Sequence, residues 1–317
     1  MLELTSKVRE IARNLLEEGR VEVVIGFERG TMPLRRTPCF VRQKGEVGRL
    51  IWDSFCENNL AKYLVGRAEP LAIVAKGCDV RTIVELIKEN QLRREQVIII
   101  GVPCQGMVDW RGIEAGFEGG EVREAEEKDG SLILKGADFE KTLKRDDFLY
   151  PSCQTCTHRN PVIYDLLAGE LVTEREADPY QDVAEFETRS GEERWGYFTL
   201  EFSRCVRCYA CRNACPLCYC QECFVDSTHP QWVGKTTNAS DTMAFHLTRA
   251  FHLAGRCVDC GACERACPVG VGIRKLNRKL VKDVKERFGY EAGLSLEQVA
   301  PLATFKPDDP EEFMVNP

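Results

Sequence analysis

The sequence predicts an N-terminal α/β domain with a small, mostly parallel sheet, followed by a domain built from helices. Two observations lead to this fold class. Up to Cys104, short apolar runs typical of buried strands alternate with helical stretches, and that order implies parallel strands. Beyond Leu200, two copies of one cysteine motif are separated and followed by stretches with the apolar spacing of amphipathic helices.

The N-terminal elements follow from apolar spacing and from helix and strand boundaries. Residues 5–19 have an apolar helical face, with Thr5 or Ser6 as the cap and Gly19 as the stop. A second helix is expected over 47–64. The further elements expected in this part are strands over 21–27, 38–43, 71–75 and 97–101, a helix over 82–91, and a hairpin over 121–135.

A cysteine follows each of the last two of these strands. Strand 71–75 continues into KGCDVR, and strand 97–101 continues into VPCQG. Because the carboxyl ends of neighbouring parallel strands meet at one edge of a sheet, we expect Cys78 and Cys104 at that edge, where ligands usually bind. The helix start beside Cys78 also favours a thiolate or an anionic cluster.

A C-x2-C pair, Cys153 and Cys156, lies further along the chain in YPSCQTCTHRNP. Two thiolates need two more ligands to close a four-thiolate site. Cys78 and Cys104 are the natural candidates, with Cys39 as a substitute, so we predict an iron–sulfur cluster in the N-terminal domain. The alternative is that Cys78 and Cys104 are small buried hydrophobic residues.

The C-terminal domain is organised by two identical cysteine registers, CVRCYACRNACP at 205–216 and CVDCGACERACP at 257–268. In C-x2-C-x2-C-x3-C-P, three thiolates bind one 4Fe-4S cluster and the fourth binds the other cluster. The spacing therefore predicts a first cluster on Cys205, Cys208, Cys211 and Cys267, and a second on Cys257, Cys260, Cys263 and Cys215. Structural zinc sites also use C-x2-C pairs, but the third cysteine and the C-P ending argue against zinc.

Helical stretches surround these two motifs. The 41 residues from Pro216 to Arg256 are too many for the compact ferredoxin built from a short β-repeat. Residues 238–256 and 273–289 each have an apolar face at helical spacing. We therefore expect an α-helical ferredoxin domain with two 4Fe-4S clusters.

The predicted organisation has four parts. They are an α/β domain with one cluster (1–175), a charged linker (176–200), the dicluster ferredoxin domain (201–290) and an extended C-terminal tail (291–317). The tail is rich in proline, and it either lies along a partner or is disordered.

Three more cysteines follow the first motif directly, in LCYCQECF. Cys218, Cys220 and Cys223 would hold a fourth cluster, with Cys39 or Cys56 as the missing ligand. The alternative is a group of thiols that tunes a neighbouring cluster through hydrogen bonds. Cys56 is expected to be a buried packing residue on its predicted helix.

The remaining polar candidates are few. Lys76, Asp79 and Arg81, at the edge of the predicted sheet, either orient a substrate or flavin phosphate or form a local cap and ion pair. The sequence has 4 histidines, which are scattered. Of these, His246 and His252 are expected to pack or to titrate at a helix surface rather than to bind metal.

The composition argues against several function classes. A net charge of -7 over 317 residues gives no footprint for nucleic acid. No apolar run approaches the roughly 20 residues that span a bilayer, and the opening MLELTSKVREIARNLLEEG has no apolar signal-peptide core. We therefore expect a cytoplasmic protein, in which 17 cysteines indicate metal binding rather than disulfides.

Four segments of the N-terminal part carry a resemblance: LLEEGRVEVVIGF, VAKGCDVR, IIIGVPCQGM and YPSCQTCTHRNPVIYDLLAGEL. With these, the chain resembles the beta-subunit family of deazaflavin-reducing hydrogenases and formate dehydrogenases over about residues 1–170. In that family a β-α-β domain holds one 4Fe-4S cluster, and often FAD. The resemblance implies ligand roles for Cys78, Cys104, Cys153 and Cys156. The helical part resembles the dicluster module of heterodisulfide reductase small subunits.

The predicted function is a multi-cluster electron-transfer subunit of an anaerobic oxidoreductase complex. It would relay single electrons between a catalytic subunit, of a hydrogenase or formate dehydrogenase, and a flavoprotein or heterodisulfide-reductase-like partner. One alternative is a subunit with FAD that reduces a deazaflavin or nicotinamide coenzyme. MLELTSK replaces the glycine-rich turn that approaches the flavin in the family, which argues against FAD. A second alternative is an iron–sulfur redox sensor, against which the missing basic patch counts.

Overall fold

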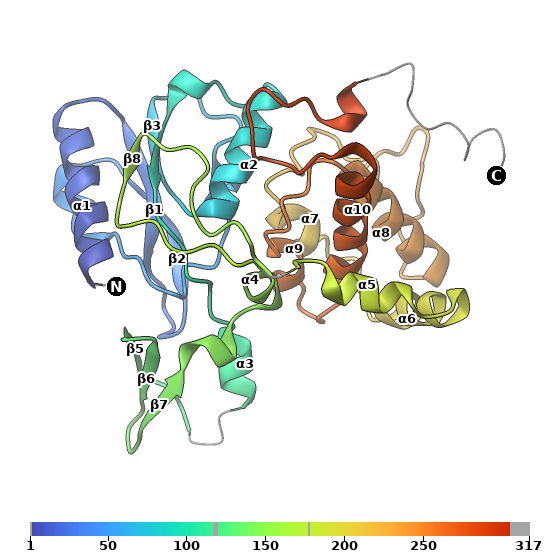
Figure 1. Ribbon diagram of the computed structural model, residues 1–317, viewed down its shortest axis with the longest axis horizontal. Coiled ribbons are helices and arrows are strands. Elements are labelled where there is room, and N and C mark those ends of the chain that lie inside the picture. Colours follow the sequence, from blue (N-terminus) through green and yellow to red (C-terminus); the bar gives the residue numbers. More distant parts are fainter. Residues whose placement is uncertain (1, 117–119, 177, 305–317) are drawn as a thin grey trace.

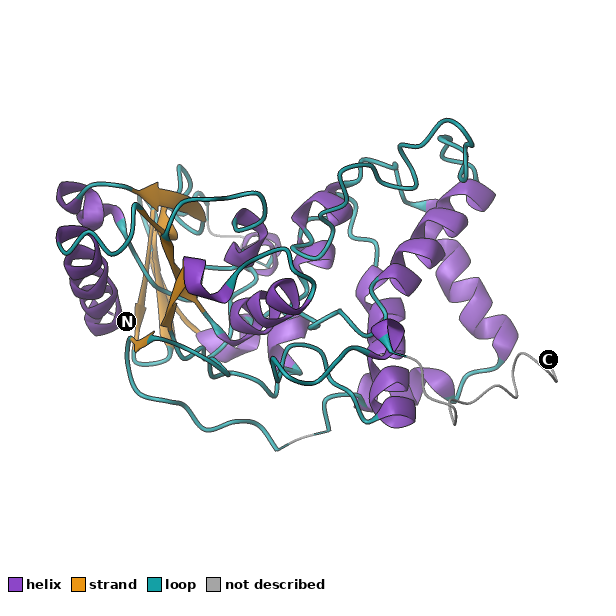
Figure 2. Ribbon diagram, turned by 90° about the horizontal axis from the view of Figure 1, so that it is seen from above, coloured by secondary structure: helices purple, strands orange, loops and turns teal. Residues whose placement is uncertain are grey.

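The computed structural model describes residues 2–116, 120–176 and 178–304. An α/β part is built around a five-stranded sheet; in the view of Figure 1 a three-stranded sheet lies below it and a helical part lies to its right. Seen from above, the strands gather at one end of the molecule and helices dominate the other end (Figure 2). The predicted fold class is thus confirmed.

The main sheet has the strand order β2-β1-β3-β4-β8. Its strands are β1 (Val23–Arg29), β2 (Arg36–Val41), β3 (Leu71–Ala75), β4 (Val97–Gly101) and β8 (Leu166–Leu167). β2 pairs antiparallel with β1, and the other pairings are parallel. Every residue of β3 is buried, as expected for a central parallel strand covered on both faces.

Helices α1 (Leu2–Glu17) and α2 (Gly77–Lys88) lie on opposite faces of this sheet (Figure 1). α1 buries Val8, Ala12 and Leu15, which recur at helical spacing along one face. α2 follows β3 directly, so β3, α2 and β4 form the predicted β-α-β unit, with Ala75 paired to Gly101 at the strand ends. The carboxyl ends of these two strands therefore open toward the helical part.

The prediction of a helix over 47–64 is wrong. Two short 3-10 turns, η1 (Lys44–Arg49) and η2 (Leu60–Tyr63), stand near the ends of that range. Between them the backbone bonds to distant partners. The N–H of Trp52 donates to the Thr5 hydroxyl over 3.0 Å, and the N–H of Ile51 donates to the carbonyl of Phe27 over 2.8 Å. These long-range bonds replace the local bonds that a helix needs.

The smaller sheet is antiparallel, with the order β5-β6-β7. Its strands are β5 (Glu124–Lys128), β6 (Ser131–Lys135) and β7 (Glu140–Lys144), so the predicted hairpin is confirmed and a third strand is added. Leu132 and Leu134 of β6 are buried against Phe55, Val108 and Ile113. The short helices α3 (Trp110–Ala115) and α4 (Pro151–Gln154) flank this sheet along the chain.

The helical part contains α5 (Gln181–Glu187), α6 (Gly191–Ser203), α7 (Ala210–Ala214), α8 (Ala239–His252), α9 (Ala262–Arg265) and α10 (Ile273–Phe288). α8 lies between the two motifs and α10 follows the second motif, so the helices expected over 238–256 and 273–289 are confirmed. Phe202, Phe245 and Ile273, from α6, α8 and α10, form one buried cluster with Cys211 and Cys263. α6 begins inside the segment expected to be a linker and packs with the ferredoxin helices.

The two parts share buried residues. Leu217 and Leu253 of the helical part belong to the same apolar core as the main sheet. The chain after α10 also returns to α2, where Arg81 donates two hydrogen bonds to the carbonyl of Ala292 over 3.0 and 2.7 Å. The start of the expected tail is therefore buried, and residues 305–317 of that tail lie outside the described residues. Within the described chain, none of the helices has the length and apolar character that crossing a membrane requires.

Candidate metal centres

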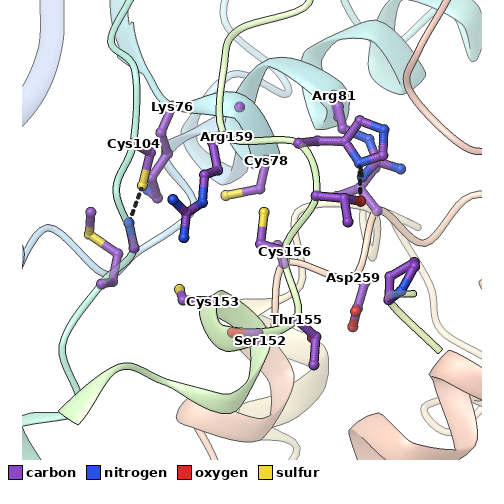
Figure 3. A pocket seen from close by; sticks show the side chains of 18 of the residues that line it. Lys76, Cys78, Arg81, Cys104, Ser152, Cys153, Thr155, Cys156, Arg159 and Asp259 are labelled. Atoms are coloured by element: carbon purple, nitrogen blue, oxygen red, sulfur yellow. Dashed lines mark hydrogen bonds between the residues drawn. The ribbon is translucent and has the colours of Figure 1, made fainter. Parts of the chain in front are cut away.

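Four cysteines from three separate segments surround one pocket beside the main sheet (Figure 3). Cys78 lies in the first turn of α2, just past β3, and Cys104 lies just past β4. Cys153 belongs to α4 and Cys156 follows it. The cavity among them has a volume of about 60 Å³. The structure therefore brings together the four N-terminal cysteines that the sequence analysis grouped.

Residues 158–160 hold these segments together. The N–H of Cys104 donates to the carbonyl of Arg159 over 2.9 Å. A Cβ atom at Gly77 would collide with the backbone oxygens of His158 and Asn160, so only glycine lets this segment lie so close to the start of α2. The C-x2-C pair is thereby carried to the edge where both strands end.

Buried cations lie around the four thiols. Lys76, with 2% of its surface exposed, interacts with Cys78 and Cys104. Arg159 extends among the cysteines, and its Nε is buried with no protein partner in the described chain (Figure 3). Arg265 also lines the pocket. A four-iron cluster on four thiolates is an anion, so this lining suits such a group.

Lys76, Asp79 and Arg81 are bound to protein groups. Nζ of Lys76 pairs with the carboxylate of Asp79 over 3.0 Å and donates to the carbonyl of Asn58 over 2.6 Å. The side chain of Asp79 accepts the N–H of Lys76 at the start of α2 over 3.2 Å. Lys76 and Asp79 therefore form the local cap and ion pair of the second interpretation, and neither side chain is free to bind a phosphate. The guanidinium of Arg81 is held by Ala292.

The four cysteines grouped for the first cluster line a second, small pocket. They are Cys205, Cys208, Cys211 and Cys267. The N–H of Arg207 donates to Sγ of Cys205 over 3.4 Å, and the N–H of Val271 donates to Sγ of Cys267 over 3.2 Å. Such N–H···S bonds favour thiolates and stabilise bound clusters.

Both motif loops have the same backbone turns. Arg207 and Tyr209 have left-handed φ angles of 54° and 60°, and Asp259 and Gly261, at the matching places of the second motif, have 54° and 72°. Non-glycine residues rarely adopt this conformation unless their surroundings require it. The repeated turns place the first three cysteines of each motif on the inside of a tight loop.

The four cysteines of the second group also lie together. Burial raises the pKa of Cys257, Cys260 and Cys263, and neighbouring thiols raise it further: Cys215 acts on Cys260 and Cys263. Nδ2 of Asn277 donates to Sγ of Cys263 over 3.6 Å. Cys215 thus comes from the first motif to the loop of the second, as the crossed ligand scheme requires.

The three groups are in contact in a fixed order. Cys260, of the second group, also lines the pocket of Cys78, Cys104, Cys153 and Cys156. The second group also adjoins the first, because Cys263 and Cys211 belong to one buried cluster and the Cys263 thiol raises the pKa of Cys211.

In the described chain, no three Cys, His, Asp or Glu side chains converge closely enough to hold a single metal ion. A four-iron cluster is wider than one ion. Its site is therefore a pocket with thiols on its walls rather than a point where they meet.

Comparison with known proteins agrees with this arrangement. Residues 68–199 match the family model for the C terminus of the beta subunit of coenzyme F420 hydrogenase/dehydrogenase, and residues 201–271 match a 4Fe-4S dicluster domain. The chain carries both of these domains. The resemblance to the beta-subunit family and the dicluster nature of the helical part are confirmed. The first domain contains Cys78, Cys104, Cys153 and Cys156, and the dicluster domain contains both C-x2-C-x2-C-x3-C-P motifs.

Two relatives extend along nearly the whole chain. The F420-dependent formate dehydrogenase subunit beta of Methanocaldococcus jannaschii is 25% identical, over 90% of this chain and 91% of that protein. The F420-dependent formate dehydrogenase 1 subunit beta of Methanococcus maripaludis is 25% identical, over 90% of each. A chain in a structure of the F420-reducing NiFe hydrogenase complex from Methanosarcina barkeri has a TM-score of 0.39 and 15% identity, over 50% of this chain and 62% of that chain.

Within the dicluster domain, Cys218, Cys220 and Cys223 line a separate cavity of about 530 Å³. Cys39 does not line it. Cys39 lies on β2 with 2% of its surface exposed, opposite Gly26, and its charged neighbours are Glu28, Glu46 and Arg49. The structure therefore does not bring Cys39 to the group that the sequence analysis assigned it to.

Cys56 is a packing residue, as expected. It is fully buried in the main core, and its thiol approaches the carbonyl of Ile51 at 3.8 Å.

The histidines differ from one another. His246 is 2% exposed and stacks on Phe202 with ring centroids 4.5 Å apart, and burial lowers its pKa to about 4. His158 approaches Glu291 at 3.4 Å. His252 is exposed and lies against Phe224 at the cavity of Cys218.

Two arginines at these sites were missed by sequence reasoning. Arg249 of α8 is 2% exposed and interacts with cysteines of both motifs, and Arg159 extends into the N-terminal pocket. Arg249 could have been found from its place beside the apolar face of the predicted helix, because an arginine rarely occupies such a position without a partner. Arg159 has no comparable local signal.

Proposed function

We propose that this chain is an electron-relay subunit of an oxidoreductase complex, with three 4Fe-4S sites in a line. The first site is Cys205, Cys208, Cys211 and Cys267; the second is Cys257, Cys260, Cys263 and Cys215; the third is Cys78, Cys104, Cys153 and Cys156. The order of contacts supports this proposal. Its central observation is that Cys260, from the dicluster domain, lines the pocket of the beta-subunit domain.

When bound, the clusters supply one-electron redox chemistry with little change of geometry. The chain's own residues hold them in sequence and adjust their surroundings. Arg249 is buried beside cysteines of the first and second sites, and Lys76 is buried beside those of the third. Buried cations favour the reduced, more negative state, and N–H···S bonds act in the same direction. The three sites can therefore be set to different potentials along one path.

The relatives support a role inside a larger assembly. Both are beta subunits of F420-dependent formate dehydrogenases. We therefore place this chain beside a catalytic subunit of the formate dehydrogenase or hydrogenase type. A flavoprotein or heterodisulfide-reductase-like partner would lie at the other end of the relay, and the complex would be cytoplasmic.

The test is an anaerobic iron and sulfide count on the full chain, followed by redox titration monitored by EPR. Since each cubane holds four irons, three sites require about 12 irons per chain. Replacing Cys153→Ala and Cys156→Ala together should remove about four of them and leave the rest. Cys56→Ala, at a buried packing thiol, is the matched control and should keep the full count. A wild-type chain with only about four irons would contradict the relay.

The same preparation addresses the flavin alternative. Acid treatment releases FAD from a flavoprotein without covalent attachment, and its absorbance can be measured beside the iron count. Stoichiometric flavin in the folded chain would favour the coenzyme-reducing role over a pure relay.

A further inference from the structure

The cysteines of LCYCQECF are not used by the two motif clusters, yet they share one cavity. Cys218, Cys220 and Cys223 line a space of about 530 Å³ between the loop after the first motif and α8. Phe224, Leu253 and Leu302 supply apolar walls to it. Three thiols on the wall of one cavity are a donor set for a soft metal centre, since thiolates select zinc, copper(I) and iron–sulfur clusters.

The charges around this cavity favour an anionic occupant. Arg212, Arg249 and Arg256 all line it; Arg212 is paired with Asp226 and Arg256 with Glu89, whereas Arg249 has no carboxylate partner in the described chain. Nε and Nη1 of Arg249 are buried without a hydrogen-bond partner in the described chain, and the guanidinium interacts with the thiols of Cys215 and Cys218. Outside the cavity, Nζ of Lys62 donates to the carbonyls of Cys215 and Cys218 over 3.2 and 3.1 Å, adding a fourth positive charge nearby.

The width of the cavity separates the possible metals. A structural zinc site brings its ligands to a single point, and zinc held by thiolates is itself anionic, so the charge of the lining does not decide between zinc and a cluster. The three thiols instead stand on the wall of a wide cavity, and the described chain has no set of such side chains that meets at one ion. A four-iron cluster on three thiolates is both wide and anionic, so it fits the space and the charge.

The cavity also identifies a fourth ligand. Its other ligand-type side chains are those of Asp226 and His252. The carboxylate of Asp226 is paired with Nη1 of Arg212 over 2.7 Å. His252, in the last turn of α8, touches Phe224 edge-on with ring centroids 5.1 Å apart, and no hydrogen bond or ion pair holds its ring in the described chain. The imidazole is therefore the side chain that is free to bind iron.

We propose that Cys218, Cys220, Cys223 and His252 bind a fourth 4Fe-4S cluster. Cys218 contacts Cys215, a ligand of the second site, so this centre adjoins the second site. It gives the helical part a branch that reaches an exposed surface, because Cys220 and His252 are both exposed. The neighbouring clusters come from the proposed function, whereas the cavity and its ligands do not depend on it.

The experiment uses the full chain reconstituted anaerobically with iron and sulfide. The wild type should then hold about 16 irons, and the double variant Cys220→Ala, Cys223→Ala should hold about 12, with the other centres retained. Cys39→Ala is the matched comparison, because Cys39 is the ligand that counting cysteines alone assigns to this group. It should keep the wild-type count. Unchanged iron in the double variant, or zinc in place of the lost iron, would overturn the proposal.

A second pair of variants tests the imidazole and does not depend on how the double variant folds. His252→Ala should leave one corner without its protein ligand, so that about one iron is lost and a three-iron cluster forms. Such a cluster gives an EPR signal in the oxidised state, where a cubane is silent. His252→Cys should restore the full count and abolish that signal. An unaltered spectrum and iron count in His252→Ala would refute the role of His252.

The proposal of the relay and the proposal of the fourth site can be refuted independently. Loss of the relay is read from variants at Cys153 and Cys156, whereas loss of the fourth site is read from variants at Cys220, Cys223 and His252. A wild-type chain with about 12 irons, and the same count in the double variant Cys220→Ala, Cys223→Ala, would keep the relay and reject the fourth site.

Discussion

Arg249 donates a hydrogen bond from Nη2 to the backbone carbonyl of Cys211 over 3.1 Å. Its guanidinium also interacts with the thiols of Cys215 and Cys263, and 2% of the residue is exposed. One buried cation therefore faces cysteines of both motifs. Because a cluster becomes more negative by one charge on reduction, this cation favours the reduced state of both neighbouring sites.

Arg249→Met should lower the reduction potentials of the first and second sites. We expect a fall of roughly 50 mV, since about 59 mV corresponds to a tenfold change in a one-electron equilibrium. An EPR-monitored redox titration of the full chain measures it. Arg287→Met, at an exposed residue of α10, is the control and should leave the potentials unchanged. Equal potentials in the wild type and Arg249→Met would contradict a tuning role.

Gly77→Ala should disrupt the third site. The added Cβ would collide with the backbone oxygens of His158 and Asn160, which cannot rotate away as a side chain can. The segment that carries the C-x2-C pair should move from the start of α2, and about four irons per chain should be lost. Gly45→Ala is the control, because nothing lies within 4 Å of its added Cβ. A full iron count in Gly77→Ala would show that the segment does not need this close approach.

The edge of the sheet could be predicted because its signals are local. Apolar runs identify β3 and β4, and a cysteine follows each run within three residues. The connection between them is long enough for one helix, so the strands must be parallel. Cys78 and Cys104 were therefore predicted at the same edge, where the structure has them.

Other features depend on contacts between distant segments. The range 47–64 contains residues that favour a helix, but Trp52 and Ile51 bond to Thr5 and Phe27 instead. Counting cysteines assigned Cys39 to the thiols of the helical part, whereas strand alternation directs its side chain into the N-terminal core. Spacing identifies ligands within a motif, but it does not say which distant residue completes a site.

Acid should remove the clusters. Burial raises the pKa of Cys104 to about 12 and, with help from neighbouring thiols, that of Cys211 and Cys263 to about 11. Empty thiols are therefore protonated at neutral pH, and loading a cluster releases their protons. Since the pH lies below these pKa values, each unit of acidification favours the empty, protonated form by about tenfold per released proton.

Iron retention should accordingly fall as the pH is lowered from about 8 to about 6. The measurement is the iron captured by a chelator from anaerobic protein at each pH, with circular dichroism to show that the chain stays folded. Retention that does not change over this range would contradict proton competition at the thiols.

Arg81 should fix the chain after α10 to the N-terminal part. Its Nε and Nη2 donate to the carbonyl of Ala292 over 3.0 and 2.7 Å, and Nη2 approaches the carboxylate of Glu291 at 3.3 Å. In Arg81→Met the buried carbonyl of Ala292 loses both of these hydrogen bonds, whereas the carboxylate of Glu291 keeps Lys285 at 3.0 Å. A buried acceptor left without its donor costs about 1–3 kcal/mol, so the free energy of unfolding should fall by that order.

The local consequence is weaker attachment of residues 290–293 to α2, because Arg81 donates two of the hydrogen bonds in that contact. Limited proteolysis of the iron-loaded chain should cut this segment faster in Arg81→Met, and the thermal midpoint should fall. Arg20→Met is the control: its ion pair with Glu18 is half exposed on both sides, and such pairs contribute less than about 1 kcal/mol. If Arg81→Met resisted the protease as well as Arg20→Met does, the hydrogen bonds of Tyr290 and Gly293 to Glu85, over 2.8 and 2.6 Å, would be sufficient to hold the segment without the arginine.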